Sequence, residues 1–178
     1  MTCESCNPNS KPSCKACSIS KIFETAQLFC DRRSLIAISE NKSKWIFENP
    51  NSKCVCHIKV EGGVISQDDT QKKCDDLFLV CHAAHKSAFF VELKGKNLEH
   101  SLLQLTNTIP RLQNELHEFC LHVRVALTKT PKIESPKEKH LKRQIIVELK
   151  KRYKKCECGA DCYFAHNATG PGYTEVVE

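Results

Sequence analysis

Apolar residues along this chain fall in short runs and in helix-like stripes separated by polar stretches, a pattern that predicts a β-sheet with helices inserted. Four runs have the length and the composition of strands, namely residues 55–60, 75–80, 88–94 and 121–127. After the first of them, Glu61-Gly62-Gly63 predicts a turn, and Val64-Ile65 begins a return strand. The polar stretch from Gln67 to Lys73 then separates this predicted hairpin from the two central strands.

Two other segments have the periodicity of helices. Apolar residues at steps of four and three mark one helix face, made of Leu98, Leu102, Leu105, Ile109, Leu112, Leu116 and Phe119. Pro110 lacks the N–H that a helix needs, so we expect a kink or a break near Ile109. Ser135-Pro136-Lys137-Glu138 has the form of a helix start, with serine as N-cap and glutamate reaching back. That helix is expected to run to about Tyr153 with its lysines outward.

The two ends of the chain have weaker patterns. Residues 19–40 contain apolar residues at helix-like spacing and are predicted to be helical. The segment 45–50 is expected to lead into a turn. Gly170-Pro171-Gly172 is unlike regular structure, so the tail 156–178 is expected to be irregular.

The order of these elements predicts an α/β fold, with a mixed central β-sheet flanked by helices. The connection from 88–94 through the long helix to 121–127 is a crossover, which makes those two strands parallel. At 178 residues the chain can bury one substantial core and a small appendage. We therefore expect a cysteine-rich metal-binding element at 1–18, a main domain at 19–155 and a cysteine-containing tail at 156–178.

Three charged residues interrupt the apolar central strands. Side chains two apart on a strand point to the same face, so Glu92 and Lys94 lie side by side, and Asp75 meets them if the strands pair. Two carboxylates and an ammonium at one point suit a hard divalent cation together with a phosphate. The alternative is a salt-bridged surface, with Asp75 and Asp76 capping a turn. Because charge in so apolar a strand is costly without a partner, the pattern favours a functional site at Asp75, whereas Asp76 points to the opposite face.

The same residues carry a family resemblance. Asp75 at a strand start, the run Phe90-Val91-Glu92-Leu93-Lys94-Gly95 and a helix carrying Leu103-Gln104-Leu105 resemble the PD-(D/E)XK nuclease superfamily, and its small bacterial members in particular. The similarity covers roughly residues 35–127. The proline that precedes the aspartate in the family motif is absent, and Cys74 stands in its place.

The resemblance implies a restriction-endonuclease-like fold and a metal-dependent endonuclease that hydrolyses phosphodiester bonds, with Mg²⁺ or Mn²⁺ as cofactor. Asp75 and Glu92, together with the carbonyl of Leu93, are the implied metal ligands, and the metal would activate water and stabilise charge on the phosphate. Lys94 would orient that water or neutralise the developing charge. Gln104 would position the nucleophile or a backbone phosphate. An upstream acid often completes such sites, and the sequence leaves three candidates open, Glu40, Glu48 and Glu61.

The charge of the chain suits a polyanionic partner. The formal charge is +6, and basic residues concentrate between 129 and 155. We expect DNA as the partner, with the lysine-rich helix at 137–155 contacting phosphates, although a merely solvated surface explains the same composition. A ribonuclease on the same scaffold, a non-catalytic zinc-containing nucleic-acid-binding protein and a homodimer also remain open.

The chain has 13 cysteines. Its N-terminus lacks the apolar core of a secretory signal, and no run approaches the roughly twenty apolar residues of a membrane span, so we expect a cytoplasmic protein without membrane contact. In a reducing compartment clustered cysteines favour metal over disulfides. Two Cys-x-x-Cys pairs are predicted to bind structural Zn²⁺, namely Cys3, Cys6, Cys14 and Cys17. An iron–sulfur cluster and a tail of free thiols are the alternatives.

A second group near the C-terminus has three thiols and an imidazole. These are Cys156, Cys158, Cys162 and His166, and they form a further zinc candidate, unless ligands come from Cys54-x-Cys56-His57 instead. The other cysteines are expected to be small buried apolar residues, namely Cys30, Cys74, Cys81 and Cys120. Three histidines lie near the proposed nuclease site in the sequence, and none is chosen as a ligand: His82, His85 and His100.

Overall fold

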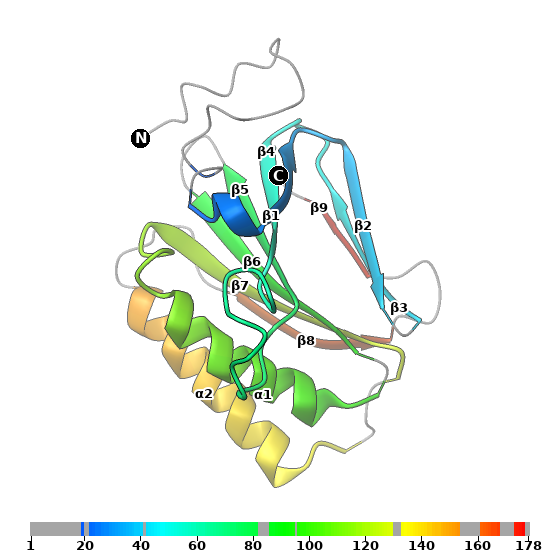
Figure 1. Ribbon diagram of the computed structural model, residues 1–178. Coiled ribbons are helices and arrows are strands. Elements are labelled where there is room, and N and C mark those ends of the chain that lie inside the picture. Colours follow the sequence, from blue (N-terminus) through cyan, green and yellow to red (C-terminus); the bar gives the residue numbers. More distant parts are fainter. Residues whose placement is uncertain are drawn as a thin grey trace.

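The computed structural model describes residues 19, 22–40, 42–81, 86–94, 96–129, 133–153, 161–167 and 173–176. Figure 1 shows a large sheet with two helices against one face and a small sheet against the other. The protein is therefore an α/β fold with a mixed sheet, as the sequence predicts.

The large sheet has six strands in the order β1-β4-β5-β6-β7-β8. Their bounds are β1 Gln27–Asp31, β4 Cys54–Lys59, β5 Asp76–Cys81, β6 Lys86–Lys94, β7 Phe119–Leu127 and β8 Asp161–Asn167. Neighbours from β1 to β6 are antiparallel, whereas β6, β7 and β8 are parallel. The predicted parallel pairing across the helical crossover is thus confirmed. The small sheet has the order β2-β3-β9, made of β2 Leu35–Glu40, β3 Ser43–Glu48 and β9 Tyr173–Val176.

Both predicted helices form where their sequence signals lie. Helix α1 spans Leu98–Thr108 and gives way to a 3-10 turn, η3 Ile109–Leu112, because Pro110 cannot continue the α-helical hydrogen bonds. Helix α2 spans Pro136–Tyr153. At its start, Glu138 N donates to Ser135 Oγ (3.1 Å) and Ser135 N donates to Glu138 Oε2 (2.6 Å), which is the predicted reciprocal cap. A short 3-10 turn, η2 Glu24–Ala26, precedes β1.

The large sheet buries both of its faces, and strand β5 shows the division. Its odd-numbered side chains, Leu77 and Leu79, pack in a core beneath α1 and α2, whereas Phe78 and Val80 pack against the small sheet with Trp45. This explains why the central strands read as nearly continuous apolar runs rather than as strict alternation. It also means that a charged side chain on either face is enclosed unless it lies at a strand end.

Residues 19–40 are not helical, and that prediction is wrong. Apart from η2, the described part of this segment forms β1 and β2. Leu28 and Leu35 are 57% and 55% exposed, whereas Ile36 is buried, so the segment follows the two-residue period of a strand. The β-branched residues favour that choice, and pairing with β4 and β3 decides it.

Residues 45–50 lead into a turn as predicted: β3 ends at Glu48, and Ser52 N donates to the Asn49 carbonyl at 3.1 Å. Two smaller expectations fail. The tail contains β8 and β9, which pair with the distant strands β7 and β3 and extend both sheets. Ile65 forms only an isolated bridge with Glu61 instead of opening a return strand. Within the part of the chain that the structure describes, neither helix is long and apolar enough to cross a membrane.

Candidate metal-binding active site

Three carboxylates and one ammonium meet at the end of β6. The Nζ atom of Lys94 lies 2.8 Å from Asp75 Oδ2, 2.9 Å from Glu92 Oε1 and 3.5 Å from Glu40 Oε2. Glu92 and Lys94 come from β6, Asp75 directly precedes β5, and Glu40 ends β2. We call this group the carboxylate cluster.

Strand register brings Asp75 and Glu92 together. Asp76 pairs with Val91 across the antiparallel β5–β6 ladder, so the preceding residue lies beside Glu92. The backbone N–H of Asp75 donates to Glu92 Oε2 at 3.3 Å. Asp76 points to the other face, where its Oδ1 lies 2.5 Å from His57 Nε2. The predicted convergence of Asp75, Glu92 and Lys94, and the opposite orientation of Asp76, therefore hold in the structure.

The upstream acid that the sequence left open is brought to the cluster by the β2–β3 hairpin. Glu40 pairs with Ser43 at the tip of this hairpin, and Ser43 Oγ donates to the Lys94 carbonyl at 2.6 Å. Glu48 pairs with Leu35 at the far end of the same two strands. Glu61 lies 3.8 Å from Lys73 instead. Of the three candidates, Glu40 is the one beside Lys94.

We predict that Glu40→Gln lowers metal-dependent activity about 10-fold or more, whereas Glu48→Gln leaves it within about 2-fold. The difference follows from the 3.5 Å approach of Glu40 to Lys94, which Glu48 lacks. Initial rates at several metal concentrations measure the effect. Equal rates for the two variants would exclude Glu40 from the site.

Burial dominates the electrostatics of Glu92, whose side chain is 0% exposed. This burial, reinforced by the negative charge of Asp75, raises the pKa of Glu92 to about 8, although Lys94 opposes the shift. In the metal-free protein Glu92 is consequently protonated at neutral pH. A cation that binds here must displace that proton, so we expect its affinity to increase with pH up to about 8.

The pKa values of Lys94 and Glu40 are also shifted by burial and by the charges of the cluster. Burial alone would lower the pKa of Lys94, but the carboxylates of Glu92 and Asp75 more than offset it, and the pKa lies above its ordinary value. Burial also raises the pKa of Glu40, against the influence of Lys94 and with that of Asp75. Lys94 therefore stays charged at every physiological pH and holds the three acids together.

The oxygen atoms of the cluster suit a hard divalent cation. Glu92 Oε1 is buried and lies 2.9 Å from Lys94 Nζ, its ion-pair partner. Mg²⁺ takes oxygen ligands, needs few carboxylates and keeps several waters, which matches a half-exposed Asp75 beside a buried Glu92. The ligand role of the Leu93 carbonyl stays a prediction. Its side chain packs on the opposite face of the sheet.

Polar side chains of α1 anchor the backbone just before Asp75. Gln104 Nε2 donates to the Lys73 carbonyl at 2.5 Å, and Cys74 N donates to Thr108 Oγ1 at 2.8 Å. Gln104 is 4% exposed. In this structure Gln104 thus holds the approach to β5 in place, and its predicted contact with a nucleophile or phosphate stays a prediction.

His100 lies close to the cluster, although the sequence does not single it out as a ligand. It is half-buried on the first turn of α1, and burial, together with the positive charges of Lys72 and Lys94, lowers its pKa. A neutral imidazole beside the cluster can accept or donate a hydrogen bond. The sequence signal for His100 is its place in the first turn of the helix that follows the Glu-x-Lys motif. His82 and His85 lie outside the described residues.

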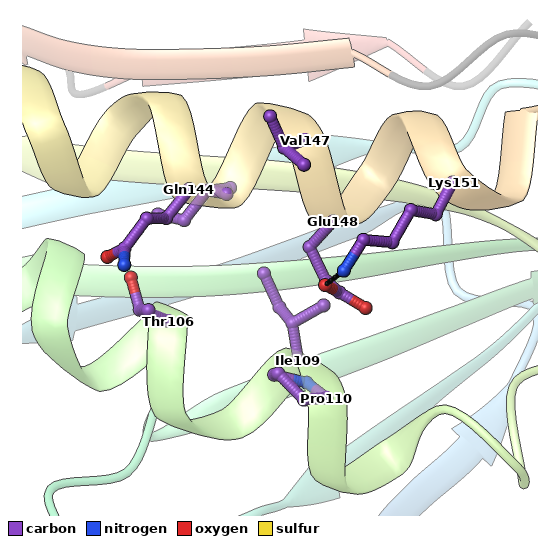
Figure 2. A pocket seen from close by; sticks show the side chains of 8 residues that line it. Thr106, Ile109, Pro110, Gln144, Val147, Glu148 and Lys151 are labelled. Carbon is purple, nitrogen blue, oxygen red and sulfur yellow. Dashed lines mark hydrogen bonds and ion pairs between the residues drawn. The ribbon is translucent and has the colours of Figure 1, made fainter.

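A groove between the two helices is separate from this chemistry. It measures about 240 Å³ and lies between α1 and α2, next to the Glu148–Lys151 ion pair of 2.8 Å (Figure 2). Thr106 and Ile109 contribute from the α1 side. None of Glu40, Asp75, Glu92 and Lys94 lines it. The candidate site is therefore a cluster at a strand end and not a deep pocket.

The predicted zinc ligands Cys3, Cys6, Cys14, Cys17, Cys156 and Cys158 lie outside the described residues. Positions 162 and 166 lie on β8. A different group of cysteines forms a cluster that has the geometry to bind a metal, namely Cys30, Cys54 and Cys56. The expectation for Cys30 is wrong, since it is half-buried and at disulfide distance from Cys56. Cys74 and Cys81 are buried as predicted. Cys120 is also buried, but it is disulfide-bonded, so the expectation of a simple apolar residue is wrong for it.

Comparison of the chain with family models, with curated proteins and with solved structures found no match. The interpretation of the carboxylate cluster therefore depends on its own geometry.

Proposed function

We propose that this protein is a metal-dependent nuclease that hydrolyses phosphodiester bonds in DNA. One observation carries the proposal, namely that Lys94 lies within 3.5 Å of Glu40, Asp75 and Glu92 at a strand end. Structural ion pairs on a surface rarely enclose a fully buried carboxylate whose pKa is raised to about 8. Such a group is instead typical of sites that bind a cation.

Asp75 and Glu92 are the residues that would hold Mg²⁺ or Mn²⁺. Bound there, the cation would supply Lewis-acid stabilisation of the phosphate and activation of water. Glu92, which burial keeps protonated in the metal-free protein, would have to lose its proton to hold the cation. Asp75 keeps its backbone hydrogen bond to Glu92, so the two carboxylates stay in register.

Lys94 contributes a permanent positive charge. Because its pKa is raised, it does not act as a base, and its role is to orient a water or to stabilise the charge that develops on the phosphate. Glu40 lies on the outer side of the cluster and adds a third oxygen donor. Gln104 would act indirectly, because its amide N–H donates to the Lys73 carbonyl and so holds the backbone that leads to Asp75.

The position of α2 supports a polyanionic substrate. Its outward residues are Lys137, Lys139, Arg143, Lys150 and Lys151. Lys137 Nζ lies 2.7 Å from Glu99 Oε1, and this ion pair links the start of α2 to the first turn of α1. Helix α1 directly follows β6, the strand whose end carries Glu92 and Lys94. Phosphate contacts along this face would strengthen binding without reading sequence, and would make binding dependent on salt.

Asp75→Asn and Asp76→Asn form a matched pair that tests the proposal. The two residues are adjacent, but only Asp75 faces Lys94, whereas Asp76 faces His57. With Mg²⁺ or Mn²⁺ we expect wild type and Asp76→Asn to cut DNA, and Asp75→Asn to be slower by about 10³-fold. Linear, circular and single-stranded DNA, with RNA in parallel, are the substrates.

Melting curves for both variants establish that each is folded. Cleavage of RNA alone would replace DNA as the substrate while keeping the site. Binding without cleavage in every metal would favour a non-catalytic nucleic-acid-binding protein. Equal activity in Asp75→Asn and wild type would reject the proposed nuclease.

A further inference from the structure

A second chemical site lies at the other end of the large sheet. Strands β1, β4 and β5 each bring cysteine to the face beneath the helices, where Cys54, Cys56 and Cys81 are buried and Cys30 is half-buried. Cys81 ends β5, whereas Asp75 precedes it, so about 20 Å of strand separates this group from the carboxylate cluster. Neither the motif nor the proposed nuclease chemistry uses these thiols.

Strand register places all four on one face. Cys30 is directly opposite Cys56, and Cys54 is directly opposite Cys81. Cys54 and Cys56 are two apart on β4 and therefore share a face. Directly opposed residues of antiparallel strands have Cβ atoms only about 5 Å apart. Three of the sulfurs, those of Cys30, Cys54 and Cys56, form one close group. Cys81 lies outside that group, and its register position opposite Cys54 makes it the residue that would complete a set of four ligands.

The sulfur separations fit one ion. Thiolates about 2.3 Å from zinc lie roughly 3.8 Å from one another in a tetrahedron. Here Cys30 Sγ and Cys54 Sγ are 3.5 Å apart, and the sulfurs of Cys30, Cys54 and Cys56 all lie within 4.8 Å of one another. A cluster of several irons needs a wider cage, because each sulfur then binds a different metal atom.

We propose that the reduced protein binds one Zn²⁺ through Cys30, Cys54, Cys56 and Cys81. The ion would link edge strand β1 to β4 and β5. With four protein ligands it would have no free coordination position for a substrate. In the structure Cys30 and Cys56 are joined as a disulfide. A dithiol reductant supplies the two electrons and two protons that open it, and is itself oxidised to a disulfide. Zinc then displaces the protons of the four thiols.

Zinc content of the full chain, purified with a reductant and supplemented with Zn²⁺, tests this site. Each of Cys30→Ser, Cys54→Ser and Cys81→Ser is expected to carry one zinc fewer per chain than wild type. Cys74→Ser is the matched control, since Cys74 is buried in the same core at the opposite end of β5 and should keep the wild-type content. The difference between variants is the measurement, so zinc bound elsewhere does not affect it. Equal zinc in all variants would overturn the proposal.

A measurement on the wild type covers the case in which a serine variant does not fold. Cys30 is half-buried at an edge strand, so an alkylating reagent should label it in the reduced, zinc-free protein. We expect bound zinc to block this labelling and a zinc chelator to restore it, as read by peptide mass. Labelling that is the same with and without the chelator rejects the site. So does a Cys30–Cys56 disulfide that persists in reduced, zinc-supplemented protein.

Discussion

Glu92→Gln is expected to abolish DNA cleavage and at the same time to stabilise the metal-free protein. The amide has nearly the same shape as the carboxylate but is a poor ligand for a hard cation. Loss of the several kcal/mol that a metal contributes to the transition state corresponds to about 10³-fold in rate. Calorimetric titration with Mn²⁺ should show weakened binding in the variant. Cleavage at the wild-type rate would remove Glu92 from the mechanism.

The gain in stability follows from the pKa of Glu92. Its value in the folded protein, about 8, is above the ordinary 4.5, so the folded state holds a proton that the unfolded state releases. Below pH 4.5 both states are protonated and no penalty exists. Between pH 4.5 and 8 the penalty grows by about 1.4 kcal/mol per pH unit, and above 8 it is complete. Glu92→Gln removes this penalty.

The opposing influence of Lys94 is already part of this pKa, so the penalty is a net value. We expect an increase of roughly 3 kcal/mol in the free energy of unfolding at pH 7, more at pH 9 and little at pH 4.5. Denaturant unfolding at the three pH values measures it. Glu148→Gln, which alters a carboxylate in the α1–α2 groove and outside the cluster, is the matched control for the substitution itself. A variant less stable than wild type at pH 9 would contradict the raised pKa.

The local part of the site could be predicted from sequence. Glu92 and Lys94 share a face because strands have a period of two, and Asp75 meets them because adjacent strands joined by a short loop pair antiparallel. Both arguments need only neighbouring segments. The break at Pro110 and the cap at Ser135 were predictable for the same reason.

The rest depended on contacts between distant segments. Glu40 could not be distinguished from Glu48, because the choice depends on which end of the β2–β3 hairpin docks against Lys94. The thiols of Cys30 and Cys56 are 26 residues apart and meet only once β1 pairs with β4. In a short apolar segment, a hydrophobic repeat of 3.6 residues, typical of a helix, is hard to distinguish from the two-residue repeat of a strand. The sequence pattern therefore predicts a helix where the structure has strands at 27–31 and 35–40.

Lys94→Met is expected to lose both activity and stability, and divalent metal should restore only the stability. Lys94 is the one cation within 3.5 Å of the three carboxylates among the described residues. Its removal takes away the positive charge that Glu40, Asp75 and Glu92 share, which we expect to cost roughly 3 kcal/mol at neutral pH. The cost should shrink as the pH falls towards 4, because the acids then take up protons.

A bound divalent cation replaces the lost charge, so saturating Mn²⁺ should recover most of the melting temperature of Lys94→Met. Cleavage should stay about 10³-fold below wild type, because the metal cannot take over the positioning of water or the second positive charge near the phosphate. Lys96→Met, which alters an exposed lysine two residues away, is the matched control and should keep both properties. Recovery of cleavage together with stability would show that Lys94 only holds the carboxylates in place. Persistent loss of cleavage in a metal-stabilised protein would instead assign the ammonium to the reaction itself.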